Sequence, residues 1–179
     1  MKNKIYLGFG SNIGDRAENI VSALSFLQSS GFVEIKKNSS FYETSAVGPK
    51  QRNFYNIAAE ASTNLKSADL LLLIKRAEEI LGRKPSKKWT PRLIDIDILF
   101  YNDEIFNGDA WQRRSDFDVN CSLPLTLPHK EICSRLFVLI PMAEIAADFV
   151  HPVLNRKINE ILQKNRLTLK NQKVKIITL

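Results

Sequence analysis

The chain has few of the features that mark secreted and membrane proteins. It contains only two cysteines, Cys121 and Cys133, in 179 residues, which do not suggest a disulfide framework or a zinc site. No apolar run approaches the roughly 20 residues that cross a bilayer. The N-terminus shows no signal-peptide core. We therefore expect a cytoplasmic protein without a membrane partner, forming one domain over 1–179.

Net charge is also small in most of the chain, because the net +7 is concentrated at one end. Residues 151–179 carry seven Lys or Arg and one Glu, whereas the preceding 150 residues are nearly balanced. We interpret this basic tail as a solvated helix and a terminal strand, and expect no nucleic-acid partner. The internal imbalance that matters lies between Ile80 and Ile94. This stretch has no acidic residue and five basic ones: Arg83, Lys84, Lys87, Lys88 and Arg92.

Hydrophobic periodicity and turn residues predict an α+β fold. The expected order is a strand at 5–9, a turn at 10–14, a helix capped by Asp15, one long strand at 32–44, a strand at 54–64, a helix capped by Ser67 and a strand at 93–100. This β-α-β-β-α-β order is typical of a ferredoxin-like sandwich. Both helices would pack on one face of the sheet and leave the other face free to carry a site.

The rest of the chain predicts additions to that core. Residues 103–122 are polar and acidic and indicate a long insertion. Helical stretches are expected up to 147 and at 155–164, followed by a closing strand at 174–179.

Two carboxylates, Asp95 and Asp97, interrupt an otherwise apolar run. Residues two apart in a strand point the same way, so both carboxylates share a face while Ile94, Ile96 and Ile98 point into the core. Like charges there are unfavourable unless a cation lies between them, and Mg²⁺ prefers one or two carboxylates plus substrate phosphates. Beside a basic loop, the pair indicates phosphoryl transfer. From the pattern alone, a solvated strand edge is the alternative.

Several short motifs occur along the chain in a definite order and spacing. They are Gly10-Ser11-Asn12, Phe41-Tyr42-Glu43-Thr44, Gly48-Pro49, Phe54-Tyr55-Asn56, Glu78 with Gly82-Arg83, Trp89-x-Pro91-Arg92-x-x-Asp95-x-Asp97-Ile98-Leu99, and Pro128-His129 with Arg135 and Phe137. Together they resemble the 6-hydroxymethyl-7,8-dihydropterin pyrophosphokinase family of folate biosynthesis. The resemblance implies transfer of diphosphate from ATP to the hydroxymethyl group of the pterin, with release of AMP.

The resemblance also implies a role for each motif residue. Two Mg²⁺ would be held by Asp95 and Asp97, and ATP would be the co-substrate. The implied catalytic residues are Arg83, Trp89, Arg92, Asp95 and Asp97, with the first two on a loop that closes over the reactants. The implied pterin contacts are Thr44, Ser45, Val47, Asn56 and the sandwiching rings of Phe54 and Phe137. The implied ATP contacts are Glu78, Arg92, Ile98, Thr126, His129 and Arg135.

The chain departs from the family pattern at a few positions. Ser45 stands where proline is common, Thr90 where glycine is usual, and Lys130 where tyrosine is common. The basic loop has no clear second arginine, so Lys84 or Lys87 would substitute, although lysine lacks the bidentate fork of arginine. We expect these changes to affect loop closure and ATP affinity more than the chemistry.

Two other functions remain as alternatives. An RNA-recognition module shares the β-α-β-β-α-β order, but it needs an aromatic strand motif that this chain lacks. A non-catalytic pterin- or nucleotide-binding domain would keep the aromatic pair without needing both carboxylates. For the enzyme, we expect a monomer whose partners are the small molecules ATP and hydroxymethyldihydropterin.

Overall fold

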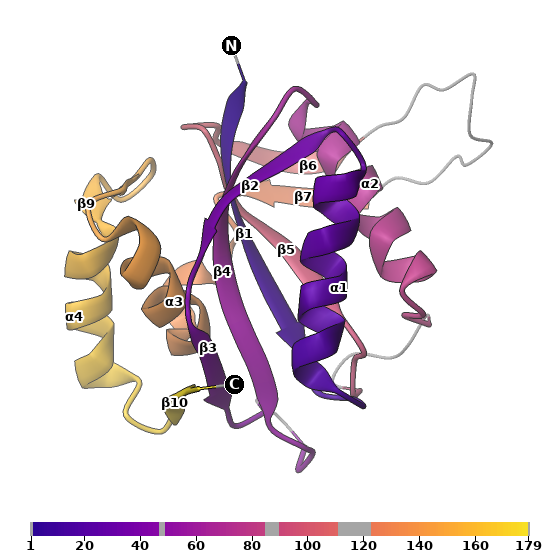
Figure 1. The fold of residues 1–179 in the computed structure, drawn as a ribbon. Helices are drawn as coiled ribbons and strands as arrows, with labels where there is room; N and C mark the ends of the chain where they lie inside the picture. The colour runs from indigo at the N-terminus through magenta and orange to yellow at the C-terminus, as the bar shows by residue number, and fades with distance from the viewer. Residues whose placement is uncertain (1, 47–48, 85–89, 111–122, 179) are drawn as a thin grey trace.

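The computed structural model describes residues 2–46, 49–84, 90–110 and 123–178, and in it a sheet lies between two helical layers (Figure 1). The sheet contains β1 (Asn3–Ser11), β2 (Val33–Asn38), β3 (Phe41–Thr44), β4 (Phe54–Thr63), β5 (Asp95–Tyr101) and β10 (Val174–Ile177). Its order is β10-β3-β4-β1-β5, β2 also pairs with β4, and the pairings are antiparallel. The predicted α+β class is confirmed.

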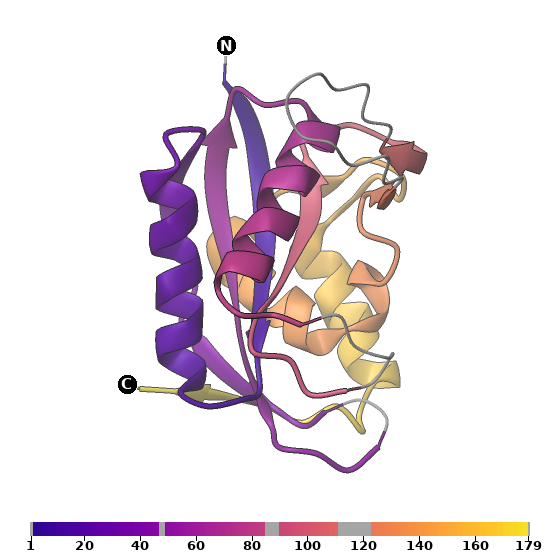
Figure 2. The ribbon, with the colours of Figure 1, turned by 90° about the vertical axis from the view of Figure 1, so that its right-hand side faces the viewer.

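The helices divide between the two faces of the sheet. Figure 2 shows α1 (Arg16–Ser29) and α2 (Ser67–Ile80) side by side in front of it, with α3 (Leu136–Ala146) and α4 (Ile158–Thr168) behind. Side chains of β1 alternate accordingly: Ile5 and Leu7 join the core under α1 and α2, whereas Tyr6 joins the core under α3 and α4. The second face is therefore partly covered, and the expectation that it would be free was wrong in this respect.

The cap of α1 was predicted correctly and that of α2 was not. The Asp15 carboxylate accepts hydrogen bonds from the backbone N–H groups of Ala17 (3.2 Å) and Glu18 (3.1 Å). In α2 the N-cap is Lys66, without a side-chain bond, and Ser67 is the first helical residue. The Ser67 hydroxyl instead donates to Glu104 at 2.8 Å. A serine has several competing local partners, and tertiary contacts decide among them.

The predicted strand at 32–44 is broken between β2 and β3. The backbone N–H of Ala58 donates to the hydroxyl of Ser39 at 3.0 Å, so a side chain replaces a backbone carbonyl in the ladder. The backbone N–H of Ser40 donates to Glu144 of α3 at 3.0 Å, and Tyr42 donates to the same carboxylate at 2.8 Å. The break thus depends on a partner 104 residues away, which a local pattern does not reveal.

The C-terminal half adds short elements to this core. Part of the predicted insertion is ordered as strand, because β6 (Phe106–Ala110) pairs with β7 (Leu123–Leu127). A short 3₁₀ helix η1 (Ile132–Ser134) precedes α3, and β8 (Val150–His151) pairs with β9 (Arg156–Lys157). Within the described ranges no helix has the length and apolar character needed to cross a bilayer.

The Asp15 cap gives a test of the fold. We expect Asp15→Ala to lower the free energy of unfolding by about 1 kcal/mol, because two first-turn N–H groups lose their acceptor. Urea denaturation monitored by circular dichroism measures this. The control is Glu79→Ala, which removes an exposed pair with Arg76 and should change stability by less than about 0.5 kcal/mol. Equal losses in the two variants would show that Asp15 does not act as a cap.

Candidate active site

A pocket of about 230 Å³ lies between the sheet and the N-terminal end of α3. Its floor includes Gly8 and Gly10 of β1, which pair with Asp97 and Asp95 of β5. On the other side Gly10 pairs with Asn56 of β4. A Cβ on Gly10 would lie only 3.0 Å from the Asn56 Oδ1 atom. Glycine therefore leaves the floor open on the same face of β1 on which Tyr6, two residues before Gly8, is covered by helices.

One half of the pocket combines flat aromatic rings with polar groups. Phe54 of β4 and Phe137 of α3 line it from the sheet and from the helix. Asn56 is buried and donates to the Thr44 hydroxyl at 2.8 Å. Thr44 and Ser45 continue the wall. A planar ligand with a polar edge fits this combination, because the rings can stack on its faces while amide and hydroxyl groups bond its edge.

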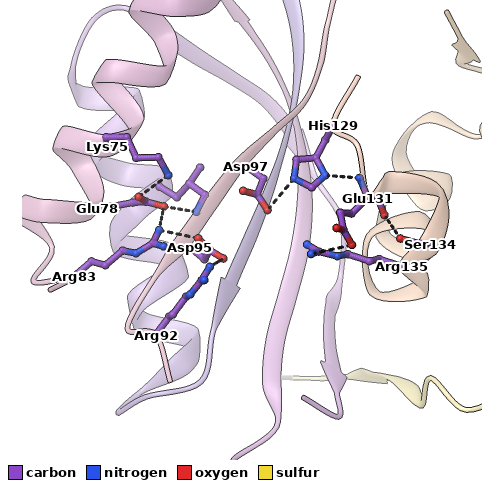
Figure 3. A network of polar contacts seen from close by, with 11 residues as sticks. Lys75, Glu78, Arg83, Arg92, Asp95, Asp97, His129, Glu131, Ser134 and Arg135 are labelled. Carbon is purple, nitrogen blue, oxygen red and sulfur yellow. Dashed lines mark hydrogen bonds and ion pairs between the residues drawn. The ribbon is translucent and has the colours of Figure 1, made fainter. Parts of the chain in front are cut away.

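The other half contains the two carboxylates, which share one face as predicted but differ in environment (Figure 3). Asp95 accepts a hydrogen bond from Arg83 at 2.7 Å and a second from Arg92. Burial raises the pKa of Asp95, but the two guanidinium groups outweigh it and hold the pKa below the ordinary 3.8. For Asp97, burial and then the charge of Asp95 raise the pKa above 3.8. Its side chain is still 35% exposed and faces His129, with Oδ2 and Nε2 3.9 Å apart.

His129 is oriented by its own backbone and by its neighbour. Its N–H donates to the carbonyl of Leu99 at 3.0 Å, which places the residue beside β5. Its Nδ1 accepts from the backbone N–H of Glu131 at 3.3 Å, so Nε2 carries the proton in the neutral ring and points toward Asp97. Burial lowers the pKa of His129 below 6.5 despite the nearby Asp97 charge. The ring is therefore mostly neutral at pH 7.

Glu78 of α2 is buried, with only 3% of the residue exposed. Its carboxylate accepts from the backbone N–H of Ile96 at 2.7 Å, from Lys75 at 2.9 Å, and from Arg83. It therefore joins α2 to β5 and holds Arg83 against Asp95 (Figure 3). Glu78 is therefore not an ordinary charge on the surface of a helix.

Asn12 is a structural residue of the site that the sequence reasoning missed. Its backbone N–H donates to the Arg92 carbonyl at 3.0 Å, and its Oδ1 accepts from the Arg92 N–H at 2.7 Å. Its amide nitrogen donates to Gln51 and to the carbonyl of Arg52. Gly10 and Ser11 belong to β1, so the predicted turn begins later than expected. The motif Gly10-Ser11-Asn12 was the available signal, but a turn residue gives no indication of its long-range partners.

The predicted site residues other than Glu78 fall into four groups. Those that line the pocket are Thr44, Ser45, Phe54, Asn56, Arg92, Asp95, Asp97, Arg135 and Phe137. Arg83 and His129 reach it through Asp95 and Asp97. The side chain of Ile98 is buried in the core under α1 and α2, and Thr126 of β7 bonds Asn107 at 3.2 Å. Val47, Trp89 and Lys87 lie outside the described residues.

The carboxylate pair is the candidate for a divalent cation. No group of three or more His, Cys, Asp or Glu suited to a metal occurs in the described part of the chain. A pair is sufficient for Mg²⁺, which keeps several waters and takes the remaining ligands from substrate phosphates. Burial and then the charge of Asp95 raise the pKa of Asp97, and a divalent cation bound between the two carboxylates would offset the cost of their charges.

Comparison with known proteins agrees with this geometry. Residues 6–147 match the model of the family described as 7,8-dihydro-6-hydroxymethylpterin-pyrophosphokinase (HPPK). The chain is 38% identical over 164 residues to 2-amino-4-hydroxy-6-hydroxymethyldihydropteridine pyrophosphokinase of Aquifex aeolicus, covering 91% of this chain and 92% of that protein. It is 38% identical to the Folic acid synthesis protein FOL1 of Dictyostelium discoideum, covering 89% of this chain but only 22% of the relative.

A solved structure agrees on the fold. The Plasmodium falciparum HPPK-DHPS A437G/K540E with pterin and p-hydroxybenzoate superposes with a TM-score of 0.74 at 17% identity. The match covers 97% of this chain and 47% of that one, so the chain spans about half the length of this neighbour.

The family match and the Aquifex relative support the pyrophosphokinase interpretation and give no support to an RNA-binding module. The chain belongs to the 7,8-dihydro-6-hydroxymethylpterin-pyrophosphokinase family.

Proposed function

We propose that this pocket transfers diphosphate from ATP to 6-hydroxymethyl-7,8-dihydropterin, giving AMP and the pterin diphosphate. Family membership supports the activity. The observation that carries the assignment of residues is one glycine-floored pocket that brings the aromatic pair and the carboxylate pair together. Phe54 and Phe137 stack on the pterin, and Asn56 with Thr44 bonds its polar edge. The pterin hydroxymethyl group then points toward Asp95 and Asp97.

Asp95 and Asp97 would hold two Mg²⁺, with the phosphates of ATP as further ligands. When bound, the ions neutralise charge on the phosphates and lower the pKa of the attacking hydroxyl. In the structure Asp95 is paired with Arg83 and Arg92. The phosphates of ATP are alternative acceptors for these guanidinium groups, so we propose that both arginines turn toward ATP and release Asp95.

The remaining cations would bind and orient ATP. Arg135 lines the pocket beside Phe137, with its guanidinium carbon 5.6 Å from the ring centroid. Neutral His129 presents an Nε2–H donor near Asp97. Phosphoryl transfer depends mainly on such positioning and charge stabilisation, since little covalent chemistry is left for protein groups. Roles for Glu78, Ile98, Thr126, Val47 and Trp89 in ligand contact stay predictions from the family resemblance.

We also propose that residues 1–179 form a single ferredoxin-like pyrophosphokinase domain that acts as a cytoplasmic monomer. The strand order β3-β4-β1-β5, with α1 and α2 on one face, supports this topology. The packing of α4 on α3 and the pairing of β10 with β3 support inclusion of the C-terminal segment.

The metal role is tested by Asp97→Asn. Since charge stabilisation by metal ions contributes several kcal/mol, the rate of AMP formation with ATP, Mg²⁺ and hydroxymethyldihydropterin should fall about a hundredfold or more. The control is Asp103→Asn, an exposed aspartate after β5, which should keep the parental rate. Near-parental turnover of Asp97→Asn at saturating Mg²⁺ would contradict the role.

The unequal environments of the two carboxylates predict opposite effects on stability without ligands. Asp95 has a lowered pKa, so its stabilising contribution is present above pH 3.8 and is lost as pH falls through its folded-state pKa. Asp97 has a raised pKa, so its charged form destabilises the fold at neutral pH, and this penalty is absent below pH 3.8. At pH 7 we therefore expect Asp95→Asn to lower the melting temperature and Asp97→Asn to raise it.

Thermal melts of the two variants at pH 7 and at about pH 3 decide this, because both differences from the parent should shrink on acidification. A lower melting temperature for both variants at pH 7 would mean that Asp97 is compensated in the folded chain and is not held at a cost in stability.

The pterin site is tested by Phe54→Ala. Loss of one stacking ring should weaken binding of a pterin analogue by about two- to tenfold, given about 0.5–1.5 kcal/mol for an aromatic pair, and leave ATP binding nearly unchanged. Isothermal titration calorimetry measures both ligands. Phe32→Ala, at a phenylalanine that is 54% exposed, is the matched control. Equal weakening of both ligands would indicate that Phe54 is an ordinary core residue.

A further inference from the structure

The segment that presents Arg135 and Phe137 to the pocket is the junction between η1 and α3. Arg135 lies between η1 and α3 in an extended conformation, with φ −125° and ψ 104°, and it is the N-cap of α3 without a side-chain capping bond. The first N–H groups of a helix need partners from outside the helix. The direction of both pocket side chains therefore depends on what fixes this junction.

Gln172 supplies those partners from the C-terminal segment. Its Oε1 accepts from the backbone N–H of Leu136 at 2.8 Å, and its Nε2 donates to the carbonyl of Ser134 at 2.8 Å. A side-chain amide offers the same donor and acceptor as a peptide group, so it bonds the backbone on both sides of Arg135. Asn165 of α4 adds a third bond, from its amide to the carbonyl of Cys133 at 2.5 Å.

The same segment also holds the opposite wall. Immediately after Gln172, β10 pairs with β3, and Val174 lies opposite Thr44. Thr44 in turn accepts from Asn56. Gln172 itself lines the pocket together with Thr44 and Phe137. Residues 172–174 thus connect the α3 wall to the sheet wall.

We infer that Gln172 is a positioning residue of the active site, which fixes Arg135 and Phe137 relative to the Thr44 wall. This rests on the proposed function of the pocket. Gln172 lies beyond residues 6–147 that match the family model, and it acts through the backbone of the junction. Removing its two bonds should let Arg135 and Phe137 shift, and therefore weaken both ATP and pterin binding.

Gln172→Met tests this in the full-length chain. Methionine keeps the length of the side chain but has neither the amide oxygen that accepts from Leu136 nor the amide nitrogen that donates to Ser134. Calorimetry with a pterin analogue and with a non-hydrolysable ATP analogue should show each Kd raised by about tenfold, as expected for loss of two hydrogen bonds. Steady-state AMP formation should show KM raised more than kcat is lowered. Gln172→Glu, which keeps only the acceptor for Leu136, should fall between Gln172→Met and the parent.

Two controls separate positioning from general stability. Gln163→Met alters an exposed glutamine of α4, whose side chain has one described hydrogen bond, to Asn159 at 3.5 Å, and it should leave both Kd values unchanged. Ile161→Val weakens the core under α4, and should lower the melting temperature with unchanged Kd values.

The inference is overturned if Gln172→Met keeps both Kd values within about twofold of the parent, whatever its melting temperature. A parent chain that binds both ligands but forms no AMP contradicts the proposed function and leaves the binding test intact.

Discussion

The repulsion between Asp95 and Asp97 is the interaction on which the rest of the site depends. Strand geometry places the two carboxylates roughly 6–7 Å apart on one face. Guanidinium groups compensate Asp95, and Glu78 holds one of them in place from α2. Asp97 faces a histidine whose pKa is lowered by burial. The pair is therefore compensated on one side only, and phosphate-bound cations are the kind of ligand that would remove the remaining imbalance.

The pocket itself follows from strand alternation. On β1 the face that receives Tyr6 also receives Gly8 and Gly10. The tyrosine is covered by helices, whereas the glycines add no side chain and leave room beside Asn56. One strand thus contributes a packed half and an open half to the same face. The open half of this face lies opposite the N-terminal end of α3. The pocket therefore lies between the sheet and α3 and is lined by residues of both.

Sequence reasoning predicted the features that depend on local pattern. The common face of Asp95 and Asp97 follows from a period of two, and the Asp15 cap follows from short-range bonding. It did not predict the break at Ser39 and Ser40, the burial of Glu78 or the role of Asn12. Each of these depends on a partner far along the chain, such as Glu144 for Ser40 or Arg92 for Asn12. Such pairings are decided by tertiary packing, and no residue pattern near either partner indicates them.

The basic C-terminal segment shows why composition alone is a weak guide to a role. Its charge suggested a solvated helix and strand, and many of its side chains are indeed exposed. Yet its neutral amides, Asn165 and Gln172, bond the junction before α3, and β10 extends the sheet beside β3. The exposed lysines and arginines keep the outer surface in water while the amides between them face inward. A segment of this kind can contribute to a site through two amide side chains, and its net charge gives no indication that it does so.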